Sequence, residues 1–140
     1  MRVLGAIGFL LPICVCLAGC GKTYQVPGTA KVTGRVTNGG APLKVEGREI
    51  GLGMVTIGFC PLANDNAARA ESASAMLDAE GNFEVIEGVK PGNYLITVRQ
   101  WDPYPQVDRL GRKFDERNSK IIREITEDVE LIIDVSKPEG

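Results

Sequence analysis

The chain has 140 residues, with 16 basic and 18 acidic side chains, a formal net charge of −2 and no histidine. A chain of this size makes one domain, and its slight negative charge gives no electrostatic reason to bind nucleic acid. Without histidine, the chain alone cannot build Ser-His or Cys-His nucleophiles or histidine metal sites. We therefore expect a non-enzymatic protein with no catalytic, cofactor-binding or metal-ligating residues and no nucleic-acid partner.

The first 19 residues are apolar apart from Arg2 and end in small residues. Their apolar run is shorter than a spanning helix needs, but a positive start, an apolar middle and a small-residue end are typical of a secretory signal. The run Leu17-Ala18-Gly19-Cys20 resembles a bacterial lipobox, in which the cysteine becomes the lipidated N-terminus. We predict that residues 1–19 are a cleaved lipoprotein signal peptide and that Cys20 is the lipidation site. An ordinary signal and an uncleaved membrane anchor are the alternatives.

The lipobox resemblance implies a location. Bacterial lipoproteins typically carry two or three acyl chains, which makes anchoring essentially permanent. Residues 20–29 are then a lipidated tether, and the membrane is a partner through the lipid on Cys20. Gly21, rather than Asp, follows the cysteine, which favours the outer membrane over the inner one. Removing residues 1–19 from the 140 leaves 121, with 15 basic and 18 acidic side chains and a charge of −3.

Cys60 is the one cysteine that remains unmodified in the predicted mature chain. Cys14 and Cys16 leave with the signal peptide, and Cys20 carries lipid. An intramolecular disulfide is therefore excluded, although the expected compartment is oxidising. We expect Cys60 to be a small buried hydrophobic residue, with a reactive thiol or an intermolecular bridge as the alternatives.

The first predicted strand covers residues 30–37, whose even-numbered members face the core. Residues 38–42 form a turn of Asn, Gly and Pro. Residues 43–53 are read as a connecting loop with room for a short strand. A second strand covers residues 54–60, and Pro61 ends it.

Residues 64–77 combine alanine-rich helix propensity with diluting serines, and we expect a loop that leads into a strand at 72–77. Residues 78–82 predict a hairpin loop with a positive φ at Gly81, followed by a return strand at 83–86. Asp78, Glu80 and Asn82 place oxygen atoms at alternate positions, as calcium loops do, but lack the further ligands of such a loop. A plain turn is therefore favoured over a weak cation site.

Strand 92–101 follows a Pro91-Gly92 turn, with Tyr94, Ile96 and Val98 on one face and Leu95, Thr97 and Arg99 on the other. Residues 102–120 predict a long polar loop, and strands 121–125 and 129–135 close the domain. Seven short strands with period-two patterning and regular turns predict an all-β fold, a seven-stranded antiparallel Ig-like or prealbumin-like β-sandwich.

Several motifs resemble one family when they are taken in order. They are Val32-Thr33-Gly34-Arg35-Val36-Thr37, Gly40-Ala41-Pro42-Leu43, Val55 to Pro61, Asp78 to Phe83, Pro91-Gly92-Asn93-Tyr94, and Lys113-Phe114 with Asn118 to Ile121. Together they resemble the bacterial carboxypeptidase regulatory-like, or transthyretin-like, domain lipoproteins. The resemblance implies a prealbumin-like sandwich over residues 30–136 and a surface-anchored accessory role, but no reaction.

The chain departs from this family at Lys44 to Gly53, where the link between the first two strands is longer than usual. The strand register therefore stays open in residues 43–53 and 64–77. Transthyretin relatives that hydrolyse 5-hydroxyisourate use conserved histidines and a Tyr-Arg-Gly-Ser tail. The sequence has neither feature, so that activity is not expected.

Trp101 and Tyr104 are the candidate ligand-binding residues, in an aromatic and proline-rich segment that extends to Pro105. Functional sites of sandwiches often lie on such loops, and stacking on a carbohydrate or a peptide is one interpretation. The alternative is that Trp101 caps the core.

Two charged features downstream carry weaker hypotheses. The basic residues of 109–120 alternate with acidic ones, which favours a solvated loop over a phosphate-binding patch. The pairs Ser119-Lys120 and Ser136-Lys137 are not expected to be catalytic, because adjacent strand residues point to opposite faces.

The sequence thus predicts an extracytoplasmic lipoprotein of the cell envelope with a non-catalytic binding or scaffolding domain. One alternative is a glycan- or peptide-binding module that uses the Trp101 to Pro105 segment. Another is an accessory subunit of an envelope enzyme. The expected partner beside the membrane is an envelope protein or a glycan.

Overall fold

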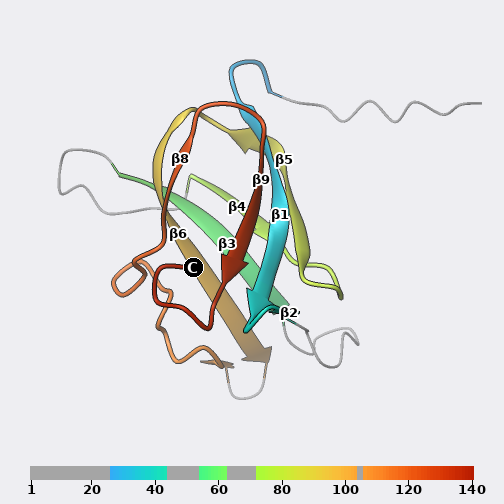
Figure 1. Ribbon diagram of the computed structural model, residues 1–140, viewed down its shortest axis with the longest axis vertical. Helices are drawn as coiled ribbons and strands as arrows, with labels where there is room; N and C mark the ends of the chain where they lie inside the picture. The colour runs from blue at the N-terminus through green and yellow to red at the C-terminus, as the bar shows by residue number, and fades with distance from the viewer. Residues whose placement is uncertain (1–25, 44–53, 63–71, 104–105) are drawn as a thin grey trace, which may run out of the picture.

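The computed structural model describes residues 26–43, 54–62, 72–103 and 106–140 (Figure 1). The predicted signal peptide, Cys20 and the first part of the tether lie outside these ranges, as do residues 44–53 and 63–71. The described ranges hold no helix that is both long and apolar enough to cross a bilayer. Their strands are β1 (Ala30–Asn38), β2 (Ala41–Pro42), β3 (Met54–Pro61), β4 (Ala73–Met76), β5 (Asn82–Val89), β6 (Gly92–Pro103), β7 (Gln106–Asp108), β8 (Ile122–Ile125) and β9 (Val129–Asp134).

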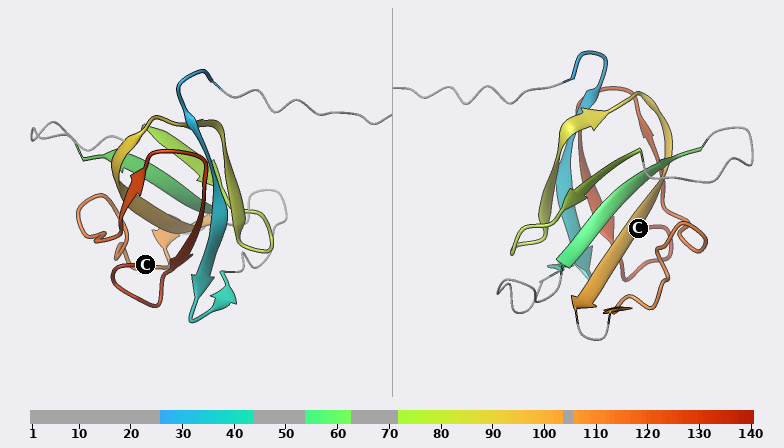
Figure 2. Two further views of the ribbon diagram at one scale, coloured as in Figure 1. Left: turned by 45° about the horizontal axis from the view of Figure 1, so that its top comes forward. Right: turned by 180° about the vertical axis from the view of Figure 1, so that it is seen from behind.

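These strands form two sheets that pack face to face. In the first sheet β1 is central and pairs with β5, β9 and the short β2. In the second sheet the order is β4-β3-β6, and both β7 and β8 pair with β6. The right-hand view of Figure 2 shows β3 and β6 as one layer with β1, β5 and β9 behind it. The prediction of an all-β sandwich is therefore confirmed, and β2 and β7 add to the seven predicted strands.

The prediction of a wholly antiparallel sandwich is wrong for one pair of strands. β9 runs parallel to β1, in a register from Val32↔Val129 to Thr37↔Asp134. The link 126–128 carries the chain from one sheet to the other at the end of the sandwich where β1 begins (Figure 1). Since β9 starts at that same end, it must run in the direction of β1.

The prediction of a β-hairpin around residues 78–82 is also wrong in its pairing. Gly81 has the expected positive φ of 83°, and the turn is present. However, β4 pairs with β3 whereas β5 pairs with β1, so the turn connects the two sheets. The alternation of β5 does not distinguish these partners, because the same apolar face packs on the core in either arrangement.

Residues 102–120 are not one long loop as the sequence predicts. β6 continues to Pro103, and β7 folds back on it with Trp101 opposite Asp108. Further along, the Val98 amide donates to the carbonyl of Phe114 and the Ile96 amide to that of Ile121. The segment 109–121 therefore lies along the edge of β6.

The core lies between the sheets and is built on alternate strand residues, as the sequence predicts. Phe59 is fully buried and contacts Phe83 at 6.5 Å and Tyr94 at 6.2 Å between ring centroids. Burial of each such large apolar side chain contributes roughly 1.5–3 kcal/mol before conformational entropy is counted. Cys60 is fully buried too, which confirms its predicted environment.

The strand directions define two ends of the sandwich. The entry end holds residues 26–30, the turn at Pro91 and the link 126–128, and these segments lie side by side. The opposite end, which we call the distal end, holds the C-terminal ends of β1, β6 and β9 together with β7 (Figure 1). The described chain therefore enters at one end, and Trp101 lies toward the other.

Candidate functional site

Trp101 lines a pocket of about 440 Å³ on the distal half of the sandwich, which we call the Trp101 pocket. Its lining residues are Arg99, Trp101, Val107, Asp108, Gly111, Arg112 and Asp115. The volume lies within the roughly 300–1,000 Å³ of small-molecule sites. Trp101 itself is half-buried, which leaves part of its ring to line the pocket. The other sequence candidates of this segment, Tyr104 and Pro105, lie outside the described residues.

Arg99 positions the indole ring of Trp101. The guanidinium carbon lies 5.7 Å from the ring centroid, in a cation–π contact, and the same guanidinium pairs with Glu116. The Nε atom of Arg99 is buried and has no hydrogen-bond partner within the described part of the chain. Arg99 and Trp101 share a face of β6 because they are two residues apart on a strand.

Asp108 organises the floor of the Trp101 pocket rather than offering a free carboxylate. Its Oδ1 accepts hydrogen bonds from the amides of Gln100 at 3.1 Å and Leu110 at 3.0 Å. Its Oδ2 accepts one from the amide of Arg112 at 3.1 Å. The side chain therefore fastens the turn after β7 to the edge of β6.

Asp115 has the same role one turn later and is only 3% exposed. It accepts hydrogen bonds from the amides of Arg117 and Asn118, each at 3.0 Å, and from Arg112 Nε at 3.0 Å. Burial raises the pKa of this carboxyl, but these hydrogen bonds and the charge of Arg112 outweigh burial and hold the pKa below its ordinary value of 3.8. The prediction of a merely solvated loop is therefore wrong for Asp108 and Asp115, whose buried carboxylates accept hydrogen bonds from the backbone amides of the loop and hold its conformation.

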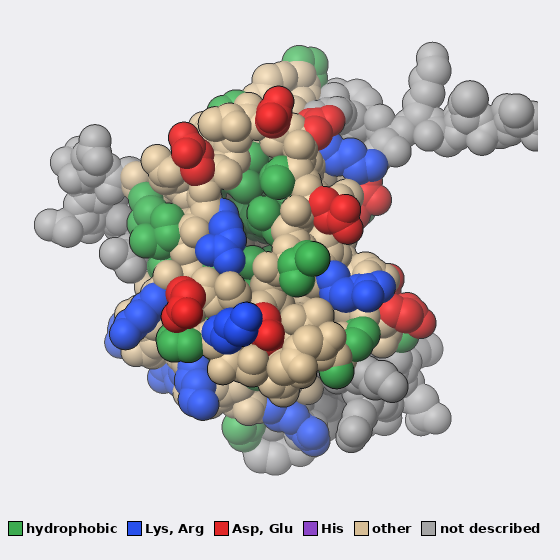
Figure 3. Space-filling view, viewed as in Figure 1, with side chains coloured by type: hydrophobic (Ala, Val, Ile, Leu, Met, Phe, Trp, Pro, Cys, Tyr) green, Lys and Arg blue, Asp and Glu red, His purple; other side chains and the backbone are tan. Residues whose placement is uncertain are grey.

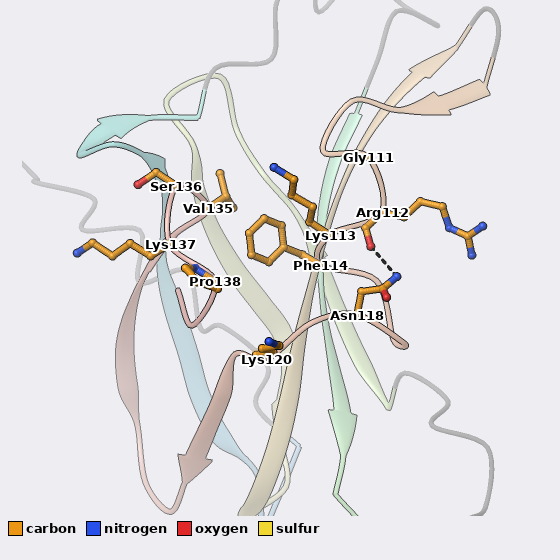
Figure 4. Close-up of a pocket in the computed structure, with 10 residues that line it drawn as sticks. All are labelled: Gly111, Arg112, Lys113, Phe114, Asn118, Lys120, Val135, Ser136, Lys137 and Pro138. Carbon is orange, nitrogen blue, oxygen red and sulfur yellow. Dashed lines mark hydrogen bonds between the residues drawn. The ribbon is translucent and has the colours of Figure 1, made fainter.

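A second hollow, of about 530 Å³, lies on the other side of the Gly111–Arg112 turn from the Trp101 pocket. We call it the basic groove (Figure 4). It runs between the 111–120 segment and the turn that follows β9. Its lining residues are Gly111, Arg112, Lys113, Phe114, Asn118, Lys120, Val135, Ser136, Lys137 and Pro138. The basic residues after position 108 were the sequence signal for this groove. Its other wall, formed by residues 135–138, could not be placed without the fold.

The other candidates from the sequence have structural roles. The carboxylate of Asp78 accepts hydrogen bonds from the amides of Glu80 at 3.0 Å and Asn82 at 2.8 Å, so it closes the inter-sheet turn. Within the described ranges, no group of three or more Cys, Asp or Glu side chains is placed to hold a metal ion.

The two Ser-Lys pairs are not assembled as dyads. Ser119 is buried and its hydroxyl donates to the carbonyl of Ile96, while Lys120 is exposed. The hydroxyl of Ser136 donates to Asp134 Oδ1 at 2.8 Å.

No family model matches the chain, and no curated protein matches it. Among solved structures, it is similar to a DUF3823 family protein from Parabacteroides merdae, with 18% sequence identity and a TM-score of 0.46. The match covers 76% of this chain and 45% of that protein, so the chain spans less than half the length of this structural relative.

Proposed function

We propose that the protein is a cell-envelope lipoprotein, anchored through Cys20, whose β-sandwich is a non-catalytic binding module with its ligand site at the Trp101 pocket. The observation that carries the proposal is that the entry end of the sandwich and the Trp101 pocket lie on opposite halves of the domain. The chain enters the sandwich at Val26 to Ala30, and the pocket lies on the distal half.

This placement suits a lipid-anchored receptor. Residues 21–29 reach at most about 30 Å when fully extended, so the entry end would stay near the bilayer. The Trp101 pocket would then open toward the compartment rather than toward the lipid. A glycan or a peptide of that compartment could reach the pocket without displacing the anchor.

The chemistry of the pocket supports binding rather than catalysis. The carboxylates of Asp108 and Asp115 are occupied by backbone amides, and proton transfer would cost those hydrogen bonds. The side chain of Arg112 is 70% exposed at the mouth, where it can donate to a ligand. Trp101 and Val107 supply apolar surface beside these polar groups, and small-molecule sites combine the two.

We also place the domain among the carboxypeptidase regulatory-like sandwiches, as a proposal on the order of its motifs. Val32 to Thr37 lie in β1, Asp78 to Phe83 span the inter-sheet turn and the start of β5, and Pro91 to Tyr94 lead into β6. The hydroxyl of Tyr94 donates to the Lys90 carbonyl at 2.7 Å, which explains why a tyrosine suits this position. An experimental structure with a strand order foreign to that family would contradict the assignment.

The experiment uses Trp101 as its own reporter, because it is the only tryptophan in the sequence. The full chain in neutral detergent is screened on a glycan array, and each hit is titrated while tryptophan emission is followed. We expect saturable emission changes and loss of array binding in Trp101→Ala. The matched control is Ile132→Ala, which removes an apolar side chain that is 69% exposed on the other sheet. Array binding that survives in Trp101→Ala would count against the pocket as the ligand site.

A further inference from the structure

The basic groove has an apolar floor flanked by lysine side chains. In Figure 4 the ring of Phe114 points across the groove toward Val135, with Lys113 above it and Lys120 below it. Phe114 is 3% exposed and Val135 9%, so the floor belongs to the core. Lys137 lies on the opposite wall with its ammonium directed outward.

Within the described part of the chain the lysines of the groove form no close ion pairs, although the pKa of Asp134, which hydrogen bonds from Ser136 lower, is lowered further by the nearby charge of Lys137. Lys113, Lys120 and Lys137 are all exposed, and none forms an ion pair with a described residue. Arg112, by contrast, is paired with Asp115 and turned to the other side of the loop. Ammonium groups such as those of Lys113 and Lys120, which lie on one wall of the groove without a close ion pair, attract anions.

The neutral polar side chains of the groove carry no charge that could balance the lysines, and their donor groups are bound to neighbouring residues. The side-chain amide of Asn118 donates to the Arg112 carbonyl and to Asp115, and the Ser136 hydroxyl donates to Asp134. Asp115 is buried beside Arg112, and Asp134 accepts hydrogen bonds from the amides of Gly39 and Ser136, so both carboxylates are already engaged, although Asp134 also attracts Lys137.

The charge of the surrounding surface has the same sign. Segment 109–120 contains five basic and two acidic residues, whereas Glu127 and Asp128 line the entry end. Figure 3 shows basic side chains predominating in the lower half of the molecule and acidic ones around its upper end. A protein of net charge −2 therefore has a distal half that is more basic than its entry end, and the groove lies in that half.

We propose that the basic groove binds a compact ligand with two anionic groups, phosphate or carboxylate, which Lys113 and Lys120 hold on either side of Phe114. Lysine suits this role because its ammonium is a point charge that accepts several phosphate or carboxylate geometries. The proposal does not depend on lipidation or on the Trp101 pocket.

The test is isothermal titration of the full chain in neutral detergent with two probes, pyrophosphate and tri-galacturonate. The variant Lys113→Gln/Lys120→Gln is compared with Lys31→Gln/Lys90→Gln, which removes the same charge from exposed lysines outside the groove. Circular dichroism verifies that each variant retains its strands. We expect saturable binding of at least one probe, weakened about tenfold or more only in the groove variant.

The choice of probe distinguishes the two ligand chemistries. Preference for pyrophosphate would identify a phosphorylated ligand, and preference for tri-galacturonate a carboxylated sugar; either supports the proposal. Equal weakening in both variants would overturn it, because the attraction would then be a property of net charge. Failure of the wild type to bind either probe would overturn it as well, as would equally tight binding of a single-stranded oligonucleotide.

Discussion

Gly34 of β1 lies so close to Leu131 of β9 that a Cβ atom at position 34 would stand 2.0 Å from the Leu131 carbonyl oxygen. It would also stand 2.9 Å from Cζ of Phe83 on the neighbouring strand. The parallel pairing that the sequence did not predict thus depends on the absence of a side chain at this position.

Gly34→Ala should therefore destabilise the domain by about 3 kcal/mol, because the backbone of β9 must move away to admit the methyl group. Urea denaturation followed by circular dichroism measures the loss. Gly92→Ala is the matched control, since a Cβ there has its nearest neighbour at 3.5 Å and should cost far less. Equal costs for the two variants would mean that β1 and β9 do not pack as described.

Stability should fall in acid because two aspartates are held ionised. The hydrogen bonds from Arg117, Arg112 and Asn118 outweigh the burial that raises the pKa of Asp115, and the Ser136 hydroxyl lowers the pKa of Asp134. A folded-state pKa below the unfolded value of about 3.8 stabilises the protein at higher pH, and this contribution disappears as the pH falls through the folded pKa.

We expect the free energy of unfolding of Asp115→Asn to depend less on pH below about pH 5 than that of the wild type. At neutral pH the variant should lose roughly 1–3 kcal/mol, because its hydrogen bonds to charged and backbone donors are weakened. The control, Glu130→Gln, removes an exposed carboxylate from β9. An unchanged pH dependence in Asp115→Asn would refute the assigned role of this carboxylate.

Arg99 and Glu116 should contribute unequally to stability. Arg99→Met removes the ion pair with Glu116, which costs stability. It also removes a buried Nε that has no hydrogen-bond partner in the described residues, and this gain partly offsets the cost. Glu116→Ala leaves the guanidinium in place without its carboxylate. We expect Glu116→Ala to be the more destabilising of the two, by about 1 kcal/mol in denaturation experiments. In Arg99→Met the Trp101 emission should shift, because the cation over its ring is lost. The reverse order of stabilities would contradict this account.

The local structure could largely be predicted from the sequence, because each strand carries its own alternation. Val32 and Val36 face the core as expected, Gly81 has its positive φ and Pro61 ends β3. The pairing could not be predicted. The alternation of β5 fits a partner in either sheet, and nothing local shows that β9 runs alongside β1.

The candidate site was predictable only in part. Trp101 was singled out by its residue type, but its neighbours Arg99, Asp108 and Asp115 come together only when β7 and the following segment fold along β6. One local signal was overlooked. In Asp78, Asp108, Asp115 and Asp134 the carboxylate accepts a hydrogen bond from the amide two residues later, which is a turn that aspartate favours.

The measurement that tests the central claim most directly is metabolic labelling with radioactive palmitate, comparing the wild type with Cys20→Ala in fractionated cells. The account predicts label on a membrane-bound wild type that begins at Cys20, and no label on the variant. A mature protein recovered from the aqueous fraction with its first nineteen residues intact, or equal labelling of both proteins, would contradict it.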